Sequence, residues 1–177
     1  DAYNRSLSLG CLQVGLRSSR LSNDKASKFN VWQDSARKYL KEYGDFDLML
    51  DLDCTAPLRT ISDIESVLHL HLNESIDISM AITEARKNPY FNLLEYSETG
   101  FLEISKGSGQ VYSRQDAPKV YEHVSSIYVI SKNYLLEGDN LYGAKIKGHK
   151  IPYERSLDID SEFDWNIVEY LFDRTDD

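Results

Sequence analysis

The stretch FDLMLDL, residues 46–52, is a short apolar run that leads into a proline-containing turn, CTAPLRT, residues 54–60. Its few polar interruptions are typical of a β-strand that is buried on both faces. Before this run, residues 24–43 carry aromatic and apolar side chains at helical spacing. We expect that helix to begin at a cap formed by Asn23 or Asp24 and to end at Gly44.

The pattern repeats after the turn. Ser62 and Glu65 have the spacing of a capping box and predict the start of a second helix. The apolar run DISMAIT, residues 77–83, then predicts a second buried strand. The order helix, strand, helix, strand indicates a parallel sheet with helices on its faces, which is an α/β fold.

The middle of the chain interrupts this alternation. Residues 91–105 predict two short strands around a Thr99-Gly100 turn, and VSSIYVI, residues 124–130, predicts a further apolar strand. We therefore expect one α/β domain over residues 1–177, with a β-rich excursion at residues 87–122. Such an excursion serves either as a lid over a site or as an arm between subunits, because a hairpin standing off the core exposes apolar surface. A last helix is expected at about residues 161–173.

The composition excludes several classes of protein. The net charge of −9 disfavours a broad nucleic-acid surface, which needs clustered Lys and Arg. No apolar run approaches the roughly 20 residues of a membrane span, and the first 20 residues lack the pattern of a signal peptide. Cys11 and Cys54 show no metal-ligand spacing and are too few for a disulfide scaffold. We expect reduced thiols in a cytoplasmic protein, with a single disulfide between the two cysteines as the alternative.

The segment ERSLDIDSEFDW, residues 154–165, places Asp158 and Asp160 two positions apart ahead of the last helix. In an extended segment these side chains point the same way and repel each other unless a cation lies between them. Mg²⁺ commonly uses one or two carboxylates together with phosphate oxygens. The alternative is that Asp160 or Ser161 caps the final helix while Asp158 is solvated.

Three further segments carry candidate binding residues. In SRQDAPKVY, residues 113–121, Arg114 can bind a carboxylate through two hydrogen bonds, with Gln115 beside it. The segment LDCTAPLRT, residues 52–60, follows a strand at the end where open α/β sheets bind ligands. The basic segment RSSRLSNDKAS, residues 17–27, precedes a helix N-terminus, which attracts anions. The alternative in each case is an ordinary solvated loop or turn.

Taken in order, these segments resemble the cytidylyltransferases that activate nonulosonic acids, such as CMP-sialic acid and CMP-legionaminic acid synthetases. The matching segments are Arg17 with LSNDKAS, LDCTAPLR, RQDAPKVY, SSIYVI and ERSLDIDSEFDW, and the resemblance extends over about residues 14–172. It implies a three-layer α/β/α nucleotide-diphospho-sugar transferase-like fold with a mixed, mainly parallel sheet. It also implies that residues 87–122 form a dimerisation arm and that the partner is a second copy of the chain.

The resemblance implies that CTP and a nonulosonic acid react, with Mg²⁺, to give a CMP-sugar and pyrophosphate. Asp158 and Asp160 match the family's metal ligands and, with Arg114, its catalytic residues. The nucleotide contacts that it implies are Arg17, Ala26 and Ser27, and the sugar contacts are Asp53, Arg114, Gln115, Tyr128 and Tyr142. Asp53 replaces a glutamine of the sialic acid enzymes, so a carboxylate that only accepts hydrogen bonds stands in place of an amide. This difference favours a sugar other than plain N-acetylneuraminate.

The chain departs from the family at its front, because the family's N-terminal phosphate-binding loop has no counterpart here. We therefore expect the domain to be N-terminally incomplete. The alternative function is that of a catalytically inactive homologue that acts as a dimeric module for sugar-acid binding or assembly.

Overall fold

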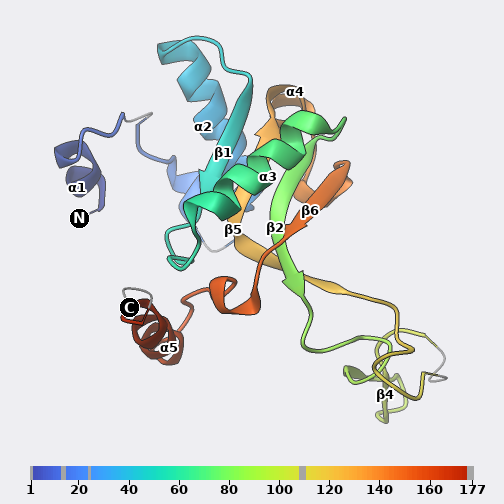
Figure 1. Cartoon of the computed structure of the whole chain (residues 1–177). Helices are drawn as coiled ribbons and strands as arrows, with labels where there is room; N and C mark the ends of the chain where they lie inside the picture. The colour runs from blue at the N-terminus through green and yellow to red at the C-terminus, as the bar shows by residue number, and fades with distance from the viewer. Residues whose placement is uncertain (1, 13–14, 24, 108–110, 175–177) are drawn as a thin grey trace. The chain divides into compact units, whose positions relative to one another are not determined.

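The computed structural model describes residues 2–12, 15–23, 25–107 and 111–174 (Figure 1). Its α-helices are α1 (Ala2–Ser8), α2 (Lys28–Glu42), α3 (Ile61–Asn73), α4 (Lys132–Glu137) and α5 (Glu162–Phe172). Its strands are β1 (Leu48–Leu52), β2 (Ile78–Glu84), β3 (Leu94–Tyr96), β4 (Leu102–Ile104), β5 (Tyr121–Ser131) and β6 (Ile146–Lys150). Three 3-10 turns are η1 (Ser19–Leu21), η2 (Leu141–Gly143) and η3 (Tyr153–Arg155).

The larger sheet has the strand order β1-β5-β2-β6. Strand β5 runs antiparallel to both of its neighbours, whereas β2 and β6 run parallel. The backbone bonds that fix these directions are Asp53 N–H to Ser126 O and Lys132 N–H to Asp47 O for β1–β5, Ala85 N–H to Val120 O and Ser131 N–H to Asp77 O for β2–β5, and Ile78 N–H to Lys145 O and Ile151 N–H to Ile82 O for β2–β6.

Three of these four strands share one direction, so the expected mixed α/β sheet is confirmed. Strands β1 and β2 run the same way, as the alternation of helix and strand predicted, but they are not neighbours because β5 lies between them. The connection between antiparallel β2 and β5 contains the β-rich excursion. The excursion thus joins two strands that a short hairpin turn would otherwise connect.

The described chain divides into two compact units. The first contains residues 1–51, 68–79 and 128–147, and the second contains residues 52–67, 80–127 and 148–177. The buried apolar side chains of the first unit are Leu21, Phe29, Trp32, Ala36, Ile78, Tyr128, Val129, Ile130 and Leu135. Those of the second are Ala56, Val67, Met80, Ala81, Ala117, Val124, Ile127, Ile151 and Val168.

Strand β1 differs from the expected strand that is buried on both faces. Leu50 and Leu52 are each 39% exposed, whereas residues 78–81 of β2 are fully or almost fully buried. The reason is position, since β1 lies at one edge of the described sheet and β2 lies inside it. An apolar run therefore predicted the strand correctly but did not show which strands flank it.

The helix starts also differ from the sequence expectation. Helix α2 is capped by Ser27, whose hydroxyl accepts a hydrogen bond from Asn30 N–H, while Asp24 lies outside the described residues. Helix α3 is opened by Thr60 and Asp63, which exchange side-chain and backbone hydrogen bonds, and not by Ser62 and Glu65. The capping box therefore lies two residues earlier than predicted.

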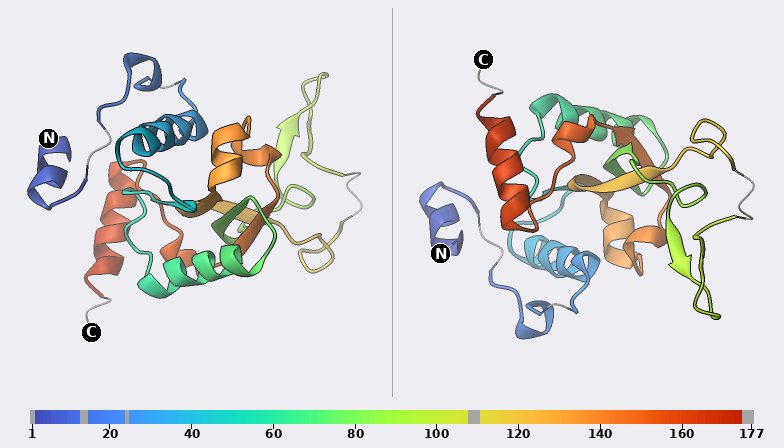
Figure 2. Two further views of the ribbon diagram at one scale, coloured as in Figure 1. Left: turned by 90° about the horizontal axis from the view of Figure 1, so that it is seen from above. Right: turned by 90° about the horizontal axis from the view of Figure 1, so that it is seen from below.

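The excursion contains the expected hairpin. Strands β3 and β4 pair antiparallel, with Tyr96 opposite Leu102, and Gly100 takes a positive φ of 82° in the turn. In both views of Figure 2 the hairpin is a separate ribbon, connected to β2 and β5 through loops. None of the helices in the described part of the chain has the length and apolar character that crossing a membrane requires.

Candidate functional site

The loop after β1 is held by one arginine. Arg59 donates hydrogen bonds to the backbone carbonyls of Asp53 and Ala56, and Asp53 N–H donates to Ser126 O at 3.2 Å. The half-buried Asp53 carboxylate accepts a hydrogen bond from the Thr55 hydroxyl at 3.4 Å. The proline-containing loop thus has a fixed backbone, and its acidic side chain lies at the carboxyl end of β1.

The acidic segment that follows η3 lies beside this loop. Ile159 N–H donates to Thr55 O at 2.9 Å, which joins two segments about a hundred residues apart in the sequence. Because Ile159 separates Asp158 from Asp160, this bond places both carboxylates next to the loop that carries Asp53. The second unit therefore brings together two of the segments that the sequence singled out.

The start of α5 confirms the Ser161 form of the capping alternative and not the Asp160 form. Ser161 is the N-cap, and its hydroxyl accepts from Asp164 N–H while the Asp164 carboxylate accepts from Ser161 N–H at 2.9 Å. The hydrogen bonds from Ser161 and the backbone lower the pKa of Asp164, against the opposing effect of burial. Neither the Asp158 nor the Asp160 side chain is needed to cap the helix.

The environment of the Asp158 carboxylate is suited to binding a cation. Its Oδ1 is buried and has no hydrogen-bond partner among the described residues, whereas Asp160 is exposed. A buried carboxylate oxygen without a donor is costly unless a cation or water reaches it. The described residues contain no group of three or more His, Cys, Asp or Glu side chains that would hold a metal without further ligands. A metal held by these two carboxylates would need further oxygen ligands, such as waters or phosphate oxygens.

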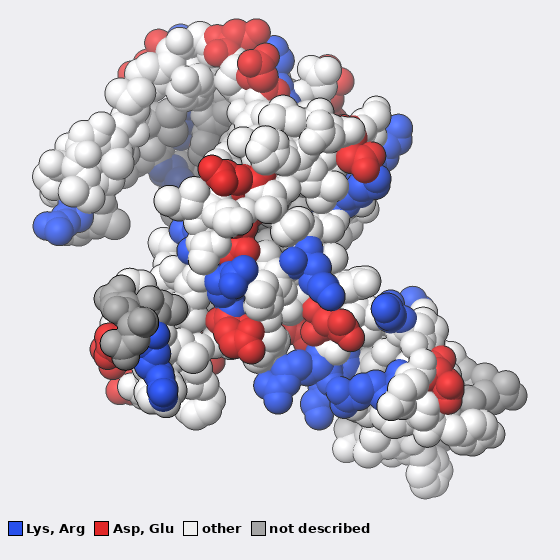
Figure 3. All heavy atoms as spheres, viewed as in Figure 1, with Lys and Arg blue, Asp and Glu red and all other residues white. Residues whose placement is uncertain are grey.

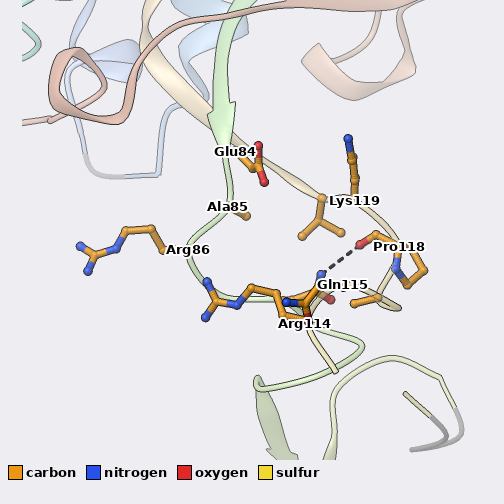
Figure 4. A pocket seen from close by; sticks show the side chains of 10 residues that line it. Glu84, Ala85, Arg86, Arg114, Gln115, Pro118 and Lys119 are labelled. Atoms are coloured by element: carbon orange, nitrogen blue, oxygen red, sulfur yellow. Dashed lines mark hydrogen bonds between the residues drawn. The ribbon is translucent and has the colours of Figure 1, made fainter. Parts of the chain in front are cut away.

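A cleft of about 270 Å³ lies in the second unit at the carboxyl end of β2. It is lined by the predicted Arg114 and Gln115 and, among other residues, by Glu84, Arg86, Asn88 and Lys119 (Figure 4). Arg86 and Arg114 extend to the same side of the cleft, and the Asn88 side-chain amide donates to Pro118 O at 2.9 Å. Three basic residues against one acidic residue favour an anionic ligand.

Arg86 connects this cleft to η3. Its Nη1 donates to the Tyr153 hydroxyl at 3.2 Å, and its guanidinium lies 4.9 Å from the centroid of the Tyr153 ring. The hydrogen bond to Tyr153 raises the pKa of Arg86 above its ordinary value, so the side chain stays charged. In Figure 3 basic side chains gather where the hairpin joins the rest of the second unit.

Sequence reasoning missed Arg86 and Lys119. A signal for Arg86 was available, because it follows β2 at the carboxyl end, where ligands of open α/β sheets bind. Lys119 precedes β5 and gave no such signal, since its place at the cleft depends on the path of the excursion.

The predicted nucleotide contacts all lie in the first unit. Arg17 is exposed ahead of η1, Ala26 is half-buried, and the Ser27 hydroxyl is engaged as the N-cap of α2. Tyr142, a predicted sugar contact, is 71% exposed on η2 of the same unit, with its N–H donating to Asn140 Oδ1 at 3.0 Å. The contacts described for these four residues neither support nor contradict their predicted roles in binding, so those roles stay predictions.

Tyr128, the other aromatic residue expected at the sugar, is a core residue instead. It is 1% exposed, and its ring packs edge-on against Trp32 with centroids 4.9 Å apart. Tyr128 points inward because it occupies the buried part of β5. This packing accounts for the position of Tyr128 without a ligand, and its role as a sugar contact stays a prediction.

No family model matches the sequence. The chain is 35% identical over 158 residues to the "post-translational flagellin modification protein B" of Campylobacter coli and 33% identical over 156 residues to the "CMP-N,N'-diacetyllegionaminic acid synthase" of Campylobacter jejuni. Each match covers 88% of this chain and 66% of the relative, so the chain spans about two thirds of the length of these relatives.

More distant relatives include the N-acylneuraminate cytidylyltransferase of Streptococcus agalactiae, which is 26% identical over 168 residues. That match covers 92% of this chain and 39% of the relative. Among solved structures, a 4-diphosphocytidyl-2C-methyl-D-erythritol synthase from Anaerococcus prevotii matches with a TM-score of 0.52 and 11% identity, over 80% of this chain and 66% of that one. At this identity the likeness concerns the fold alone.

Proposed function

We propose, from the premise that the chain belongs to the acylneuraminate (nonulosonic acid) cytidylyltransferase family, that it transfers CMP from CTP to the anomeric 2-hydroxyl of a nonulosonic acid. In this reaction the hydroxyl oxygen loses its proton to solvent and bonds to the α-phosphorus, the bond from that phosphorus to the oxygen shared with the β-phosphate breaks, and pyrophosphate leaves. The observation that carries the proposal is the position of Asp158. Its unpartnered, buried Oδ1 lies in the segment that is bonded to the loop carrying Asp53.

Asp158 and Asp160 are the proposed ligands of Mg²⁺. The bound ion would neutralise the charge on the phosphate oxygens as pyrophosphate leaves. Two carboxylates suit this metal, which keeps waters and phosphate oxygens among its ligands. The start of α5 needs neither side chain, so both remain available to a cation.

The cleft at the end of β2 is the proposed site for the sugar acid. Arg114 and Arg86 carry the positive charge that a carboxylate requires, and Gln115 supplies both a donor and an acceptor. A planar guanidinium binds a carboxylate through two parallel hydrogen bonds, so the cleft favours a ligand that presents such a group. Arg17, Ala26 and Ser27 remain the proposed nucleotide contacts, and Tyr142 a proposed sugar contact.

The sugar is proposed to be of the legionaminic type. The relatives concerned with flagellin modification and legionaminic acid are 33–35% identical to this chain, against 24–26% for the N-acylneuraminate enzymes. The Asp53 carboxylate accepts hydrogen bonds and donates none, which favours a sugar with an additional donor. Asp53→Gln should shift the relative rates toward N-acetylneuraminate. Unchanged relative rates across a panel of sugars would exclude this role for Asp53.

The working form is proposed to be a cytoplasmic homodimer built through the β3–β4 hairpin. Exposed apolar side chains support this role, since Leu94, Tyr96, Phe101 and Leu102 are between 54% and 77% exposed. A cluster of exposed apolar side chains is unfavourable in water unless another protein surface covers it. Both cysteines are free and exposed, which suits a reducing compartment.

The experiment that tests the function is pyrophosphate release from CTP in the presence of Mg²⁺ and a panel of nonulosonic acids. We expect release with a legionaminic-type acid, and a loss of about a hundredfold or more in Asp158→Asn. Asp45→Asn is the matched control, because that exposed carboxylate pairs with Lys132 in the first unit.

A dimeric sugar-acid-binding module without turnover is the second candidate. It is favoured by the cleft at the end of β2, whose arginines could bind a sugar acid whether or not a cation is bound elsewhere. Calorimetric titration with the same acids separates the two. Binding that Arg114→Met weakens about tenfold, without pyrophosphate release, would support the module and contradict the transferase.

A further inference from the structure

Arg155 and Asp63 form a two-bond ion pair in the second unit. Arg155 Nε donates to Asp63 Oδ2 at 2.7 Å, and Nη2 donates to Oδ1 at 2.8 Å. The Asp63 side chain is 5% exposed and that of Arg155 is 35% exposed. Bidentate, charge-assisted pairs are among the strongest and most directional hydrogen-bonded contacts in proteins.

Asp63 is fixed independently of Arg155. Its Oδ2 also accepts from Thr60 N–H at 2.9 Å and from the Thr60 hydroxyl at 2.8 Å, which opens α3. Thr60 ends the loop that begins at Asp53. The carboxylate that receives Arg155 is thus part of a helix start and cannot move without disturbing α3.

Arg155 in turn fixes the chain just ahead of the acidic segment. It ends η3, and Ser156 continues the turn by donating from N–H and hydroxyl to Tyr153 O at 3.0 and 2.7 Å. Three residues beyond Arg155 comes Asp158, followed by the Ile159 N–H bond to Thr55 O. The acidic segment is therefore held on both sides of Asp158 by bonds to residues 55–63.

Arg155 directs the Nε–Nη2 edge of its guanidinium to Asp63, so that edge is not available to a phosphate. The role considered for Arg155 is therefore the one it exerts through Asp63 on the segment that carries Asp158. Groups that orient metal ligands typically change metal affinity by 10- to 100-fold when they are replaced.

We propose that Arg155, anchored on Asp63, is a positioning residue that holds Asp158 in the geometry that binds the divalent cation. The proposal rests on the proposed function, because it deepens the role given there to Asp158 and Asp160. It assigns to Asp63 and Arg155 an effect on metal affinity, although neither residue is a proposed ligand.

The test uses the 177-residue chain and two readouts, Mn²⁺ affinity by titration and hydrogen exchange at Ile159 N–H. Arg155→Met should weaken Mn²⁺ binding about tenfold and speed exchange at Ile159, while exchange within β2 is unchanged. Because Arg155→Met leaves the buried Asp63 charge unpaired, the double variant Asp63→Asn/Arg155→Met is measured beside it and should show the same weakening. Arg155→Lys, which keeps the charge but not the two-bond geometry, should recover part of the affinity.

Arg37→Met is the matched control, since Arg37 is an exposed arginine of α2 that donates to Leu136 O. It should leave both readouts unchanged. Equal Mn²⁺ affinity and equal Ile159 exchange in the Arg155 variants would overturn the positioning role. If the unsubstituted chain binds no Mn²⁺, the proposed metal site is wrong, and Ile159 exchange alone then decides whether Arg155 holds the segment.

Discussion

Tyr128 packs edge-on against Trp32, with an angle of 62° between the ring planes, and the Lys28 ammonium lies 4.5 Å from the Tyr128 ring centroid. The same ammonium lies 3.1 Å from the Asp51 carboxylate. An aromatic pair and a cation–π contact therefore join the first two turns of α2 to β5 within the first unit. This arrangement makes Tyr128 a stabilising residue, and no ligand is needed to explain its position.

The first prediction concerns Tyr128. Replacing Tyr128 by Ala should lower the free energy of unfolding by about 3–5 kcal/mol, because it removes a large, fully buried side chain. Urea unfolding followed by Trp fluorescence measures the loss. Tyr142→Ala is the control, since this ring is 71% exposed, and it should change stability little. A Tyr128→Ala variant as stable as the unsubstituted chain would contradict a core role.

The contrast between Tyr128 and Tyr142 illustrates a limit of the sequence. The run VSSIYVI predicts that residues 124–130 form a strand, but it does not say which neighbours enclose each side chain. Those neighbours come from α2 and from other strands. The burial of Tyr128 thus depends on tertiary contacts that no local pattern encodes.

The local features were predictable because they depend on near neighbours in the chain. The α/β class, the hairpin turn at Gly100 and the helix beginning after Ser161 all follow from spacing and turn chemistry. The order β1-β5-β2-β6 does not, because the antiparallel insertion of β5 is decided by which strand edges meet. The ion pair between Asp63 and Arg155 was also missed, since 92 residues separate its partners.

The ion pair also predicts a pH dependence. Burial alone would raise the pKa of Asp63, but hydrogen bonds from Arg155 and Thr60 outweigh it and hold the pKa below its ordinary 3.8. A carboxyl whose pKa is lower in the folded state contributes stability above pH 3.8 and loses it as the pH falls through the lowered value. Acid unfolding should therefore be less steep below pH 3.8 in Asp63→Asn. Equal slopes in the two proteins would argue against this contribution.

His71 should affect stability at higher pH. Its side chain is buried, and burial lowers its pKa from 6.5, although Asp77 opposes the shift. As the pH falls below 6.5, the unfolded chain therefore takes up a proton at His71 more readily than the folded chain does. The free energy of unfolding should decrease over this range, whereas above pH 6.5 His71 should cause no such loss. The thermal midpoint of the unsubstituted chain should drop between pH 7.5 and pH 5, and His71→Leu should drop less. His69→Leu, on the same helix, is the comparison variant.

Gly148 on β6 is predicted to be intolerant of a side chain. A Cβ at this position would lie 2.5 Å from Ile82 Cδ1 and 2.7 Å from Ile82 Cγ2. Gly148→Ala should therefore destabilise the chain by about 1–3 kcal/mol through overpacking. The double variant Gly148→Ala/Ile82→Ala should be more stable than the sum of the two single changes implies, because the clash disappears. Additive changes in urea unfolding would place the cost elsewhere.

The hairpin provides the test of the proposed dimer. Phe101 and Leu102 are 73% and 55% exposed at the turn and on β4, so a second copy packing on this surface would bury them. Replacing both by Lys should convert a dimer to a monomer, because burying two charges at an apolar interface is costly. Multi-angle light scattering gives the mass directly.

Leu72→Lys is the matched control for the hairpin variant, since Leu72 is 61% exposed on α3 and lies outside the excursion. It should leave the dimer intact. Circular dichroism on both variants distinguishes dissociation of the dimer from unfolding of the chain. The hairpin forms a sheet of its own, so separating the two copies should leave β1, β5, β2 and β6 paired within each chain. A dimer mass retained by the Phe101→Lys/Leu102→Lys variant would place the interface on another surface.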